Sequence, residues 1–230
     1  MGALFGSLSY LRFLVDGEPH ANAGTAYEKS MESRRFLPLS PTGDGMDSAG
    51  WVPLEAPYDD DIKITRDLFL FGEIIAVAYR EDKYAIPRAL LKRETKRKVE
   101  KIAKEERKEA REMSRAFIKA VEASVLTELK AQTMPRTKLV DVIWDMKKKE
   151  VRVFGRGTVA TERISSLFER TFQVRIELGS YAARAFALDI GSRAQGVLEK
   201  LNPGWLFPDA VQRDPSEPGA GDAEDIGEAA

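Results

Sequence analysis

The spacing of apolar residues predicts a strand followed by a helix at the start of the chain. Residues 3–15 are rich in leucine, phenylalanine and valine and end at an Asp-Gly turn, so we expect them to form the first strand. Asn22 is a suitable N-cap for a helix that reaches about Phe36, and Tyr27 and Met31 are spaced to face a core. The chain is therefore expected to open with a strand–helix unit.

An irregular connection and a second strand are predicted next. Residues 38–61 contain four prolines and three glycines and end in three aspartates, a composition typical of a long loop. Residues 68–79 are mostly apolar or β-branched and predict a strand. The charged residues 80–83 predict a turn that leads to residues 84–86, so this stretch is interpreted as one strand or a hairpin.

Residues 88–134 contain no glycine or proline, and we expect them to form two helices. Pro87 suits the first helical position, and Pro135 ends the second helix. Residues 92–98 are continuously polar, so the first helix is expected to project into solvent and to meet the second near residues 104–109. The second half carries apolar residues at three-to-four spacing, which predicts a buried stripe: Ala110, Met113, Phe117, Val121, Val125 and Leu129.

The remaining segments complete an α+β pattern. Residues 138–144 and 151–154 flank a polar turn, as the strands of a hairpin do. A helix at about 159–171, a returning strand at 172–178 and an amphipathic segment at 180–201 follow. We therefore predict an α+β fold of antiparallel sheets with packed helices, from which a long basic helical hairpin projects.

Four parts of the chain are expected from these patterns. Residues 1–86 form an N-terminal α+β part, residues 87–135 form the basic helical hairpin, and residues 136–208 form a second α+β part with a C-terminal helix. Residues 209–230 are rich in Pro, Gly, Asp and Glu and are expected to be a disordered acidic tail.

A formal net charge of −1 conceals a strong segregation of charge. Residues 88–119 hold thirteen lysines and arginines against six glutamates, and residues 84–176 carry a local excess of +11. A cationic segment of this kind is typical of a protein that binds a polyanion, most often nucleic acid. The alternative is that Lys/Glu-rich helices form only a well-solvated surface.

The candidate DNA-binding residues lie on the predicted helices and on the β-hairpin. Those of the helices recur at helical spacing along one edge, and those of the hairpin gather near its tip, where they suit contacts to backbone phosphates. They are Arg88, Lys92, Lys96, Arg97, Lys101, Lys104, Lys108, Arg111, Arg115, Arg136, Lys138, Lys147, Lys148, Lys149 and Arg152. No zinc-finger or helix-turn-helix signature accompanies them, so readout of base sequence is not predicted.

No catalytic residue, metal site or cofactor is predicted. The chain contains no cysteine, which excludes a thiolate nucleophile or thiolate metal ligand, and its one histidine, His20, gives a histidine relay little support. Residues 59–61 are three adjacent aspartates without the spacing of a calcium loop and are interpreted as a charged turn. Asp141 and Asp145 match no recognisable acid–base pair.

Three short motifs and the order of the elements around them carry a family resemblance. The motifs are Gly50-Trp51-Val52-Pro53, Ile86-Pro87 ahead of the charged helices, and Met134-Pro135-Arg136. The strand–helix opening and the hairpin that turns at Asp145 before a helix complete the pattern, which covers about residues 3–178. In this order of segments the chain resembles the RdgC family of recombination-associated, nucleoid DNA-binding proteins.

The resemblance implies sequence-independent binding of double- and single-stranded DNA, a ring-shaped dimer with a basic central hole, and antagonism of RecA. Two departures limit what it carries over. The chain is expected to be a short member that lacks much of the usual C-terminal region, which leaves ring closure open. Family members tend to have Leu-Pro-Arg-Ala-Phe where this chain has residues 134–138 ending in lysine, so a contact made by the aromatic ring does not transfer.

We therefore expect a non-enzymatic, cytoplasmic and nucleoid-associated homodimer that binds DNA through lysine and arginine contacts to phosphate. RecA is a partner implied by the resemblance. Nowhere do eighteen apolar residues run together, so no membrane span is expected. Two alternatives stay open: a helical protein-interaction module without DNA binding, and a magnesium-dependent nuclease using the aspartates at 59–61 or Asp141.

Overall fold

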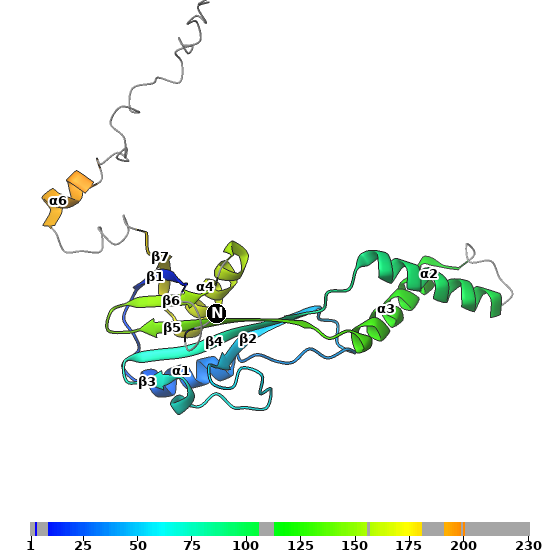
Figure 1. Ribbon diagram of the computed structural model, residues 1–230, viewed down its shortest axis with the longest axis horizontal. Coiled ribbons are helices and arrows are strands. Elements are labelled where there is room, and N and C mark those ends of the chain that lie inside the picture. Colours follow the sequence, from blue (N-terminus) through cyan, green and yellow to red (C-terminus); the bar gives the residue numbers. More distant parts are fainter. Residues whose placement is uncertain are drawn as a thin grey trace, which may run out of the picture. The chain divides into compact units, whose positions relative to one another are not determined.

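A seven-stranded antiparallel sheet forms the main body of the protein (Figure 1). The computed structural model describes residues 3, 9–105, 113–155, 157–180, 191–198 and 200. It divides the chain into two units, residues 1–183 with the sheet and residues 184–230 with helix α6 (Gly191–Leu198). The strands are β1 (Leu11–Asp16), β2 (Asp47–Pro53), β3 (Leu70–Phe71), β4 (Ile74–Lys83), β5 (Arg136–Asp145), β6 (Glu150–Phe154) and β7 (Arg175–Leu178). Across the sheet they follow the order β2-β4-β5-β6-β1-β7, with β3 paired to β4, and the predicted α+β class is confirmed.

An aromatic core lies where helices α1 (Ala23–Glu32) and α4 (Thr158–Phe172) meet one face of the sheet. Trp144 of β5 contacts the rings of Tyr27, Phe168 and Phe172, with ring centroids 5.3–5.8 Å apart. Trp51 on the edge strand β2 is fully buried and donates its indole N–H to the Thr171 hydroxyl at 2.8 Å. Because large aromatic rings bury the most apolar area per residue, this cluster fixes both helices on the sheet.

The opposite face of β4 is also covered. The strand is buried continuously from Ile75 to Arg80, as expected for a strand with both faces packed. The Arg80 guanidinium lies 4.1 Å from the centre of the Phe36 ring and donates to both oxygens of Asp82. It also reaches Asp60 at 2.6 Å, so a buried cation anchors the loop that follows β2.

The connection predicted at residues 38–61 contains strand β2, which its loop-like composition conceals. A Cβ atom at Gly50 would lie 2.4 Å from the backbone nitrogen of Phe36, so only glycine lets the segment after α1 pack alongside β2. The Phe36 N–H donates to the Trp51 carbonyl at 2.9 Å. The first helix therefore ends at Glu32 instead of reaching Phe36, because the next residues pair with β2.

The turn predicted at residues 80–83 is wrong. Strand β4 continues through Lys83, which stands opposite Arg136 of β5. Charged residues are tolerated inside the sheet here because Arg80 and Asp82 form a bidentate pair. The turn falls earlier, at Gly72, whose φ of 66° divides the predicted strand into β3 and β4.

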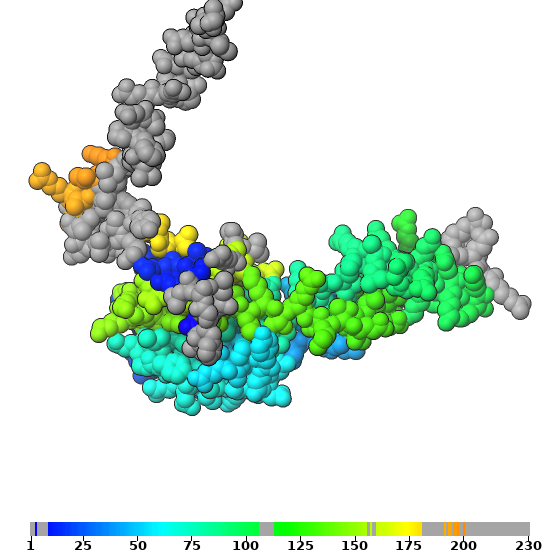
Figure 2. Space-filling model, in the orientation of Figure 1, coloured from blue at the N-terminus to red at the C-terminus, as the bar shows by residue number. Residues whose placement is uncertain are grey.

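Two helices, α2 (Arg88–Glu105) and α3 (Arg115–Gln132), connect β4 to β5 and form the helical hairpin, shown in green in Figures 1 and 2. Val99, Val121 and Val125 are buried between them. Of the predicted stripe, Met113, Phe117 and Leu129 are only partly buried, because two helices alone cannot cover each other's apolar faces. Ala110 and the predicted meeting point beyond residue 105 lie outside the described residues.

A buried lysine holds the base of the hairpin. Lys130 of α3 is 3% exposed and donates to the carbonyls of Gly43 and Gly45 at 2.7 and 3.0 Å. Its ammonium also lies 5.8 Å from the centre of the Tyr84 ring. These contacts tie α3 to the connection that precedes β2.

The later elements follow the predicted order with shifted ends. Helix α4 continues to Phe172 and ends where Gln173 adopts a left-handed conformation with φ 57°, so β7 starts at Arg175 and not at residue 172. Helix α6 lies within the predicted segment 180–201, while residues 181–190 and the predicted tail lie outside the described residues. Within the described part of the chain, no helix is long and apolar enough to cross a bilayer.

Candidate nucleic-acid interface

Basic side chains gather where the sheet gives way to the helical hairpin, a surface that we call the neck patch: Lys83, Arg88, Lys92, Arg136 and Lys138. Lys83 stands directly opposite Arg136 in the β4–β5 ladder, and Lys138 is two residues further along β5. These three side chains therefore project from the same face of the sheet. Arg88 and Lys92 lie one turn apart at the start of α2. All five are exposed, and none has an ion-pair partner among the described residues.

The first turns of both hairpin helices carry cations that do not favour the helices. Arg88 begins α2 and Arg115 begins α3, and neither first turn contains an acidic residue. The positive end of the helix dipole lies there, so each cation costs about 0.3–1 kcal/mol when exposed. Both positions therefore carry positive charge where it does not stabilise the helix.

Ion pairs partly neutralise the rest of the hairpin. The pairs are Lys96–Glu100 at 3.8 Å, Arg97–Glu94 at 3.2 Å and Lys98–Glu128 at 2.5 Å. Exposed pairs of this kind contribute about 0–1 kcal/mol, so phosphate can replace the carboxylate at little cost. The other predicted contacts are Lys101, Lys104 and Arg115, exposed and without an ion pair in the described part, and Lys108 and Arg111, outside the described residues.

The single basic edge predicted for α2 divides between two sides of the helix. Lys96 and Lys101 are five residues apart, which places them about 140° apart around the axis. Arg97 and Lys101 line the groove between α2 and α3, on the side away from Lys96. A ligand that lies along one side of α2 therefore meets only part of the predicted set.

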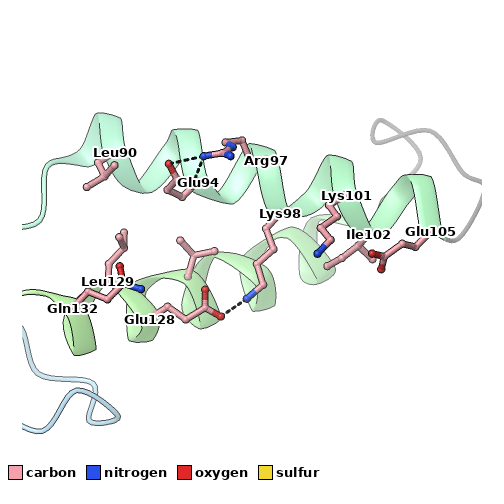
Figure 3. Close-up of a pocket in the computed structure, with 11 residues that line it drawn as sticks. Leu90, Glu94, Arg97, Lys98, Lys101, Ile102, Glu105, Glu128, Leu129 and Gln132 are labelled. Atoms are coloured by element: carbon pink, nitrogen blue, oxygen red, sulfur yellow. Dashed lines mark hydrogen bonds and ion pairs between the residues drawn. The ribbon is translucent and has the colours of Figure 1, made fainter.

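The groove between the helices has an apolar floor and a charged rim (Figure 3). It encloses about 790 Å³ over Leu90, Ile102 and Leu129. The Lys98 ammonium reaches across it to Glu128 at 2.5 Å, and this hydrogen bond lowers the pKa of the Glu128 carboxyl. The floor is the part of the hairpin's apolar stripe that the two helices leave uncovered.

The lysines of the β5–β6 turn lie at the other end of β5, about 30 Å from the neck patch along the strand. Each has an acidic neighbour: Lys147–Glu73 at 4.0 Å, Lys148–Asp145 at 3.3 Å and Lys149–Glu18 at 2.5 Å. Arg152 pairs with Glu150 at 2.7 Å. Burial raises the pKa of Asp145, but hydrogen bonds from Lys148 outweigh it and leave that pKa lowered. This predicted patch is nearly neutral as a whole.

Sequence reasoning did not select Lys83, a member of the neck patch, or Arg163, which pairs with residues on the same face of the sheet. Lys83 was expected in a turn, and only the β4–β5 register brings it opposite Arg136. Arg163 of α4 pairs with Glu81 of β4 and with Asp47 of β2, so α4 stands on the same face. Its position depends on helix packing, for which the local sequence carries no signal.

The acidic residues weighed as a nuclease site are held apart by other contacts. Asp60 pairs with Arg80, and Asp59 accepts a hydrogen bond from the Asp61 backbone at 3.1 Å. Asp141 accepts one from the Ala3 backbone N–H at 2.6 Å. Among the described residues, no three His, Asp or Glu side chains are close enough to share a metal ion.

Comparison with known proteins supports the resemblance seen in the motifs. The family model described as "Putative exonuclease, RdgC" matches residues 13–183, which include the helical hairpin and all of the sheet except the first two residues of β1. None of the curated proteins matches the chain. Because the match covers well over half of the sequence, the chain belongs to the RdgC family.

Proposed function

We propose that this protein binds DNA without regard to sequence, through lysine and arginine contacts to backbone phosphates centred on the neck patch. The observation that carries the proposal is five exposed cations at the base of the hairpin with no ion-pair partner in the described structure. Phosphate contacts position a protein on DNA and carry no base information. Double- and single-stranded DNA are both expected ligands.

Salt dependence is the quantitative signature of this mode of binding. Neutralising about five phosphates predicts a slope near −4 to −5 when the logarithm of affinity is plotted against the logarithm of salt concentration. A protein-interaction module whose charges serve only solubility shows no such slope with DNA. Anisotropy of labelled oligonucleotides of two unrelated sequences, at several salt concentrations, measures both slope and sequence preference.

Matched charge variants locate the surface. The neck variant changes Lys83, Arg136 and Lys138 to glutamine, and the control changes Lys147, Lys148 and Lys149 to glutamine, so both lose the same charge. The neck variant is expected to lose about 2.7 units of slope, at about 0.9 per contact, and most of its affinity at low salt. The control is expected to keep most of its slope, since its lysines lie at the other end of β5, about 30 Å from the neck patch along the strand. Equal losses in the two variants contradict the assignment to the neck.

The proposal describes a binding protein and not an enzyme, although the family description names an exonuclease. In its support, Asp60 is bonded to Arg80 and Asp59 to its own turn. End-labelled DNA incubated with the protein and magnesium is expected to stay intact over hours. Stepwise shortening that an Asp141→Asn variant abolishes would establish the nuclease instead.

Assembly and partners belong to the same proposal. The uncovered apolar floor of the hairpin groove supports a homodimer, since burying Leu90, Ile102 and Leu129 against a second hairpin removes apolar area from water. Sedimentation over a concentration series is expected to show twice the mass of one chain, and a monomer throughout would remove the dimer. A cytoplasmic, nucleoid-associated location and antagonism of RecA rest on the family resemblance, and a RecA filament assay tests the latter.

A further inference from the structure

A second concave site lies between α4 and the strands β2 and β4, next to the neck patch. It encloses about 410 Å³ and is lined by Ala49, Tyr79, Glu162, Arg163, Ser166 and Arg170, together with a leucine. The small side chain of Ala49 leaves the space open at the edge of the sheet. Pockets of this size, with a few polar groups on an otherwise apolar wall, suit small ligands or single groups of larger ones.

The floor of this pocket contains a polar group that the fold leaves unsatisfied. Tyr79 is 1% exposed, and its hydroxyl has no hydrogen-bond partner. The Arg163 guanidinium interacts with this hydroxyl and partly offsets the rise in its pKa, and it also donates hydrogen bonds to Glu81 and Asp47. Burial, and then the charge of Glu81, raises the pKa of this hydroxyl, so it stays protonated at neutral pH and can donate as well as accept. A buried hydroxyl without a partner destabilises the fold and calls for a functional explanation.

The wall formed by α4 supplies complementary groups. Arg163, Ser166 and Arg170 are spaced three and four residues apart and therefore line one side of the helix. Arg170 is exposed and has no ion-pair partner among the described residues, so it is available to an anion. Ser166 can donate or accept, and Glu162 accepts from an amino group. The set combines a cation for phosphate with donors and acceptors for the edge of a base.

We infer that this pocket holds one unpaired nucleotide, with its phosphate on Arg170 and its base edge at Tyr79 and Ser166. Arg163 also lines the pocket and pairs with Glu81 and Asp47, so a base that reaches the Tyr79 hydroxyl has to displace its guanidinium from them. The inference rests on the proposed function, in which DNA is held at the neck patch. Tyr79 lies on the same face of β4 as Lys83, about 13 Å along the strand. A DNA strand held at the neck patch passes this pocket, and a free nucleotide carries the same chemistry.

The test compares hydroxyl-deletion variants on three probes. Tyr79→Phe and Ser166→Ala remove groups from the pocket, and Tyr58→Phe removes the same hydroxyl from an exposed loop residue as the control. The probes are a labelled single-stranded 20-mer, the same 20-mer annealed to its full complement as a blunt duplex, and deoxyadenosine monophosphate. Thermal unfolding checks the fold, and Tyr79→Phe is expected to be no less stable than the parent because it removes an unsatisfied group.

Each pocket variant is expected to bind the single strand about 3- to 10-fold more weakly, the range of one lost hydrogen bond, and to bind the blunt duplex with an affinity within about twofold of the parent's. The Tyr58→Phe control is expected to match the parent on every probe. Unchanged single-strand binding, or equal losses on both DNAs, overturns the inference. If the parent protein binds neither DNA, the proposed function fails. In that case the inference is still supported if the parent binds the monophosphate and Tyr79→Phe weakens that binding. If the parent does not bind the monophosphate either, the inference is overturned.

Discussion

Removing the carboxylate of Asp82 is expected to destabilise the protein strongly, because it leaves a buried cation short of its main partner. The Arg80 side chain is 9% exposed and that of Asp82 is 5% exposed. Two of the four hydrogen bonds of the guanidinium go to Asp82, and the others go to Asp60 and to the Pro57 carbonyl. Hydrogen bonds to Asp82 are the main cause of the raised pKa of Arg80, and burial opposes them. The ordinary pKa of an arginine is so high that Arg80 stays charged even when Asp82 is removed.

Breaking a buried pair by deleting one partner costs about 3–5 kcal/mol. Asp60, which is 40% exposed, still faces Arg80 in an Asp82→Ala variant, so the expected cost is at the lower end, about 3 kcal/mol. With a urea m-value of about 1–3 kcal/mol/M, the unfolding midpoint moves down by about 1–3 M. Asp60→Ala serves as the control and is expected to cost less than Asp82→Ala, because Asp60 is partly exposed and accepts one of the guanidinium hydrogen bonds whereas Asp82 accepts two.

A double variant separates the ion pair from packing. Arg80→Met with Asp82→Leu replaces both charges with apolar groups, and such replacements are often neutral or stabilising. The double variant is therefore expected to be more stable than Asp82→Ala alone, as measured by urea unfolding followed by tryptophan fluorescence. A cost below about 1 kcal/mol for Asp82→Ala, or a double variant no better than the single one, refutes the reasoning.

Three further predictions follow from the packing. Gly50→Ala is expected to lower the free energy of unfolding by about 3 kcal/mol or more, since the new Cβ would lie 2.4 Å from the Phe36 backbone and neither backbone segment can move away. An unchanged midpoint in chemical unfolding contradicts this prediction. Phe117→Ala is expected to lower the free energy of unfolding by less than the about 3–5 kcal/mol typical of a fully buried ring, because Phe117 is only partly buried. If a dimer covers Phe117, the loss is expected to be larger at high protein concentration. Burial raises the pKa values of Tyr27 and Tyr79 above their ordinary value, so these hydroxyls ionise less readily in the folded state than in the unfolded chain. The free energy of unfolding is therefore expected to fall as pH rises from about 10 through their folded pKa values, and an alkaline titration of unfolding, repeated with Tyr27→Phe, checks the sign.

The hairpin and the strands around it could be predicted from sequence because their signals are local. A run without glycine or proline after Pro87 specifies helix, and a polar turn between two apolar runs specifies the β5–β6 hairpin. The motifs that carried the family resemblance lie within the residues that the family model matches. Where the chemistry of a few neighbouring residues decides the structure, the sequence was sufficient.

Strand β2 is an element that the local sequence does not predict. The prolines and glycines of residues 38–61, which include β2, are typical of a loop, yet Gly50 is required because the chain after α1 passes within van der Waals distance of it. The extension of β4 through Arg80 and Asp82 depends on the same kind of information, since a charged pair is tolerated in a sheet only when each charge finds the other. Neither requirement is visible until distant segments are placed side by side.

The sequence alone determined that cations concentrate in the middle of the chain and that no thiol chemistry is available to it. The tertiary structure decided which of those cations are free to meet a phosphate. Strand register sets Lys83 beside Arg136, whereas acidic neighbours from other strands and turns neutralise Lys147, Lys148 and Lys149. Packing of α4 on the sheet likewise brings Arg163 over the buried Tyr79 hydroxyl. Net charge is a property of composition, but the electrostatic field at a surface depends on distances between side chains, and only the fold specifies those distances.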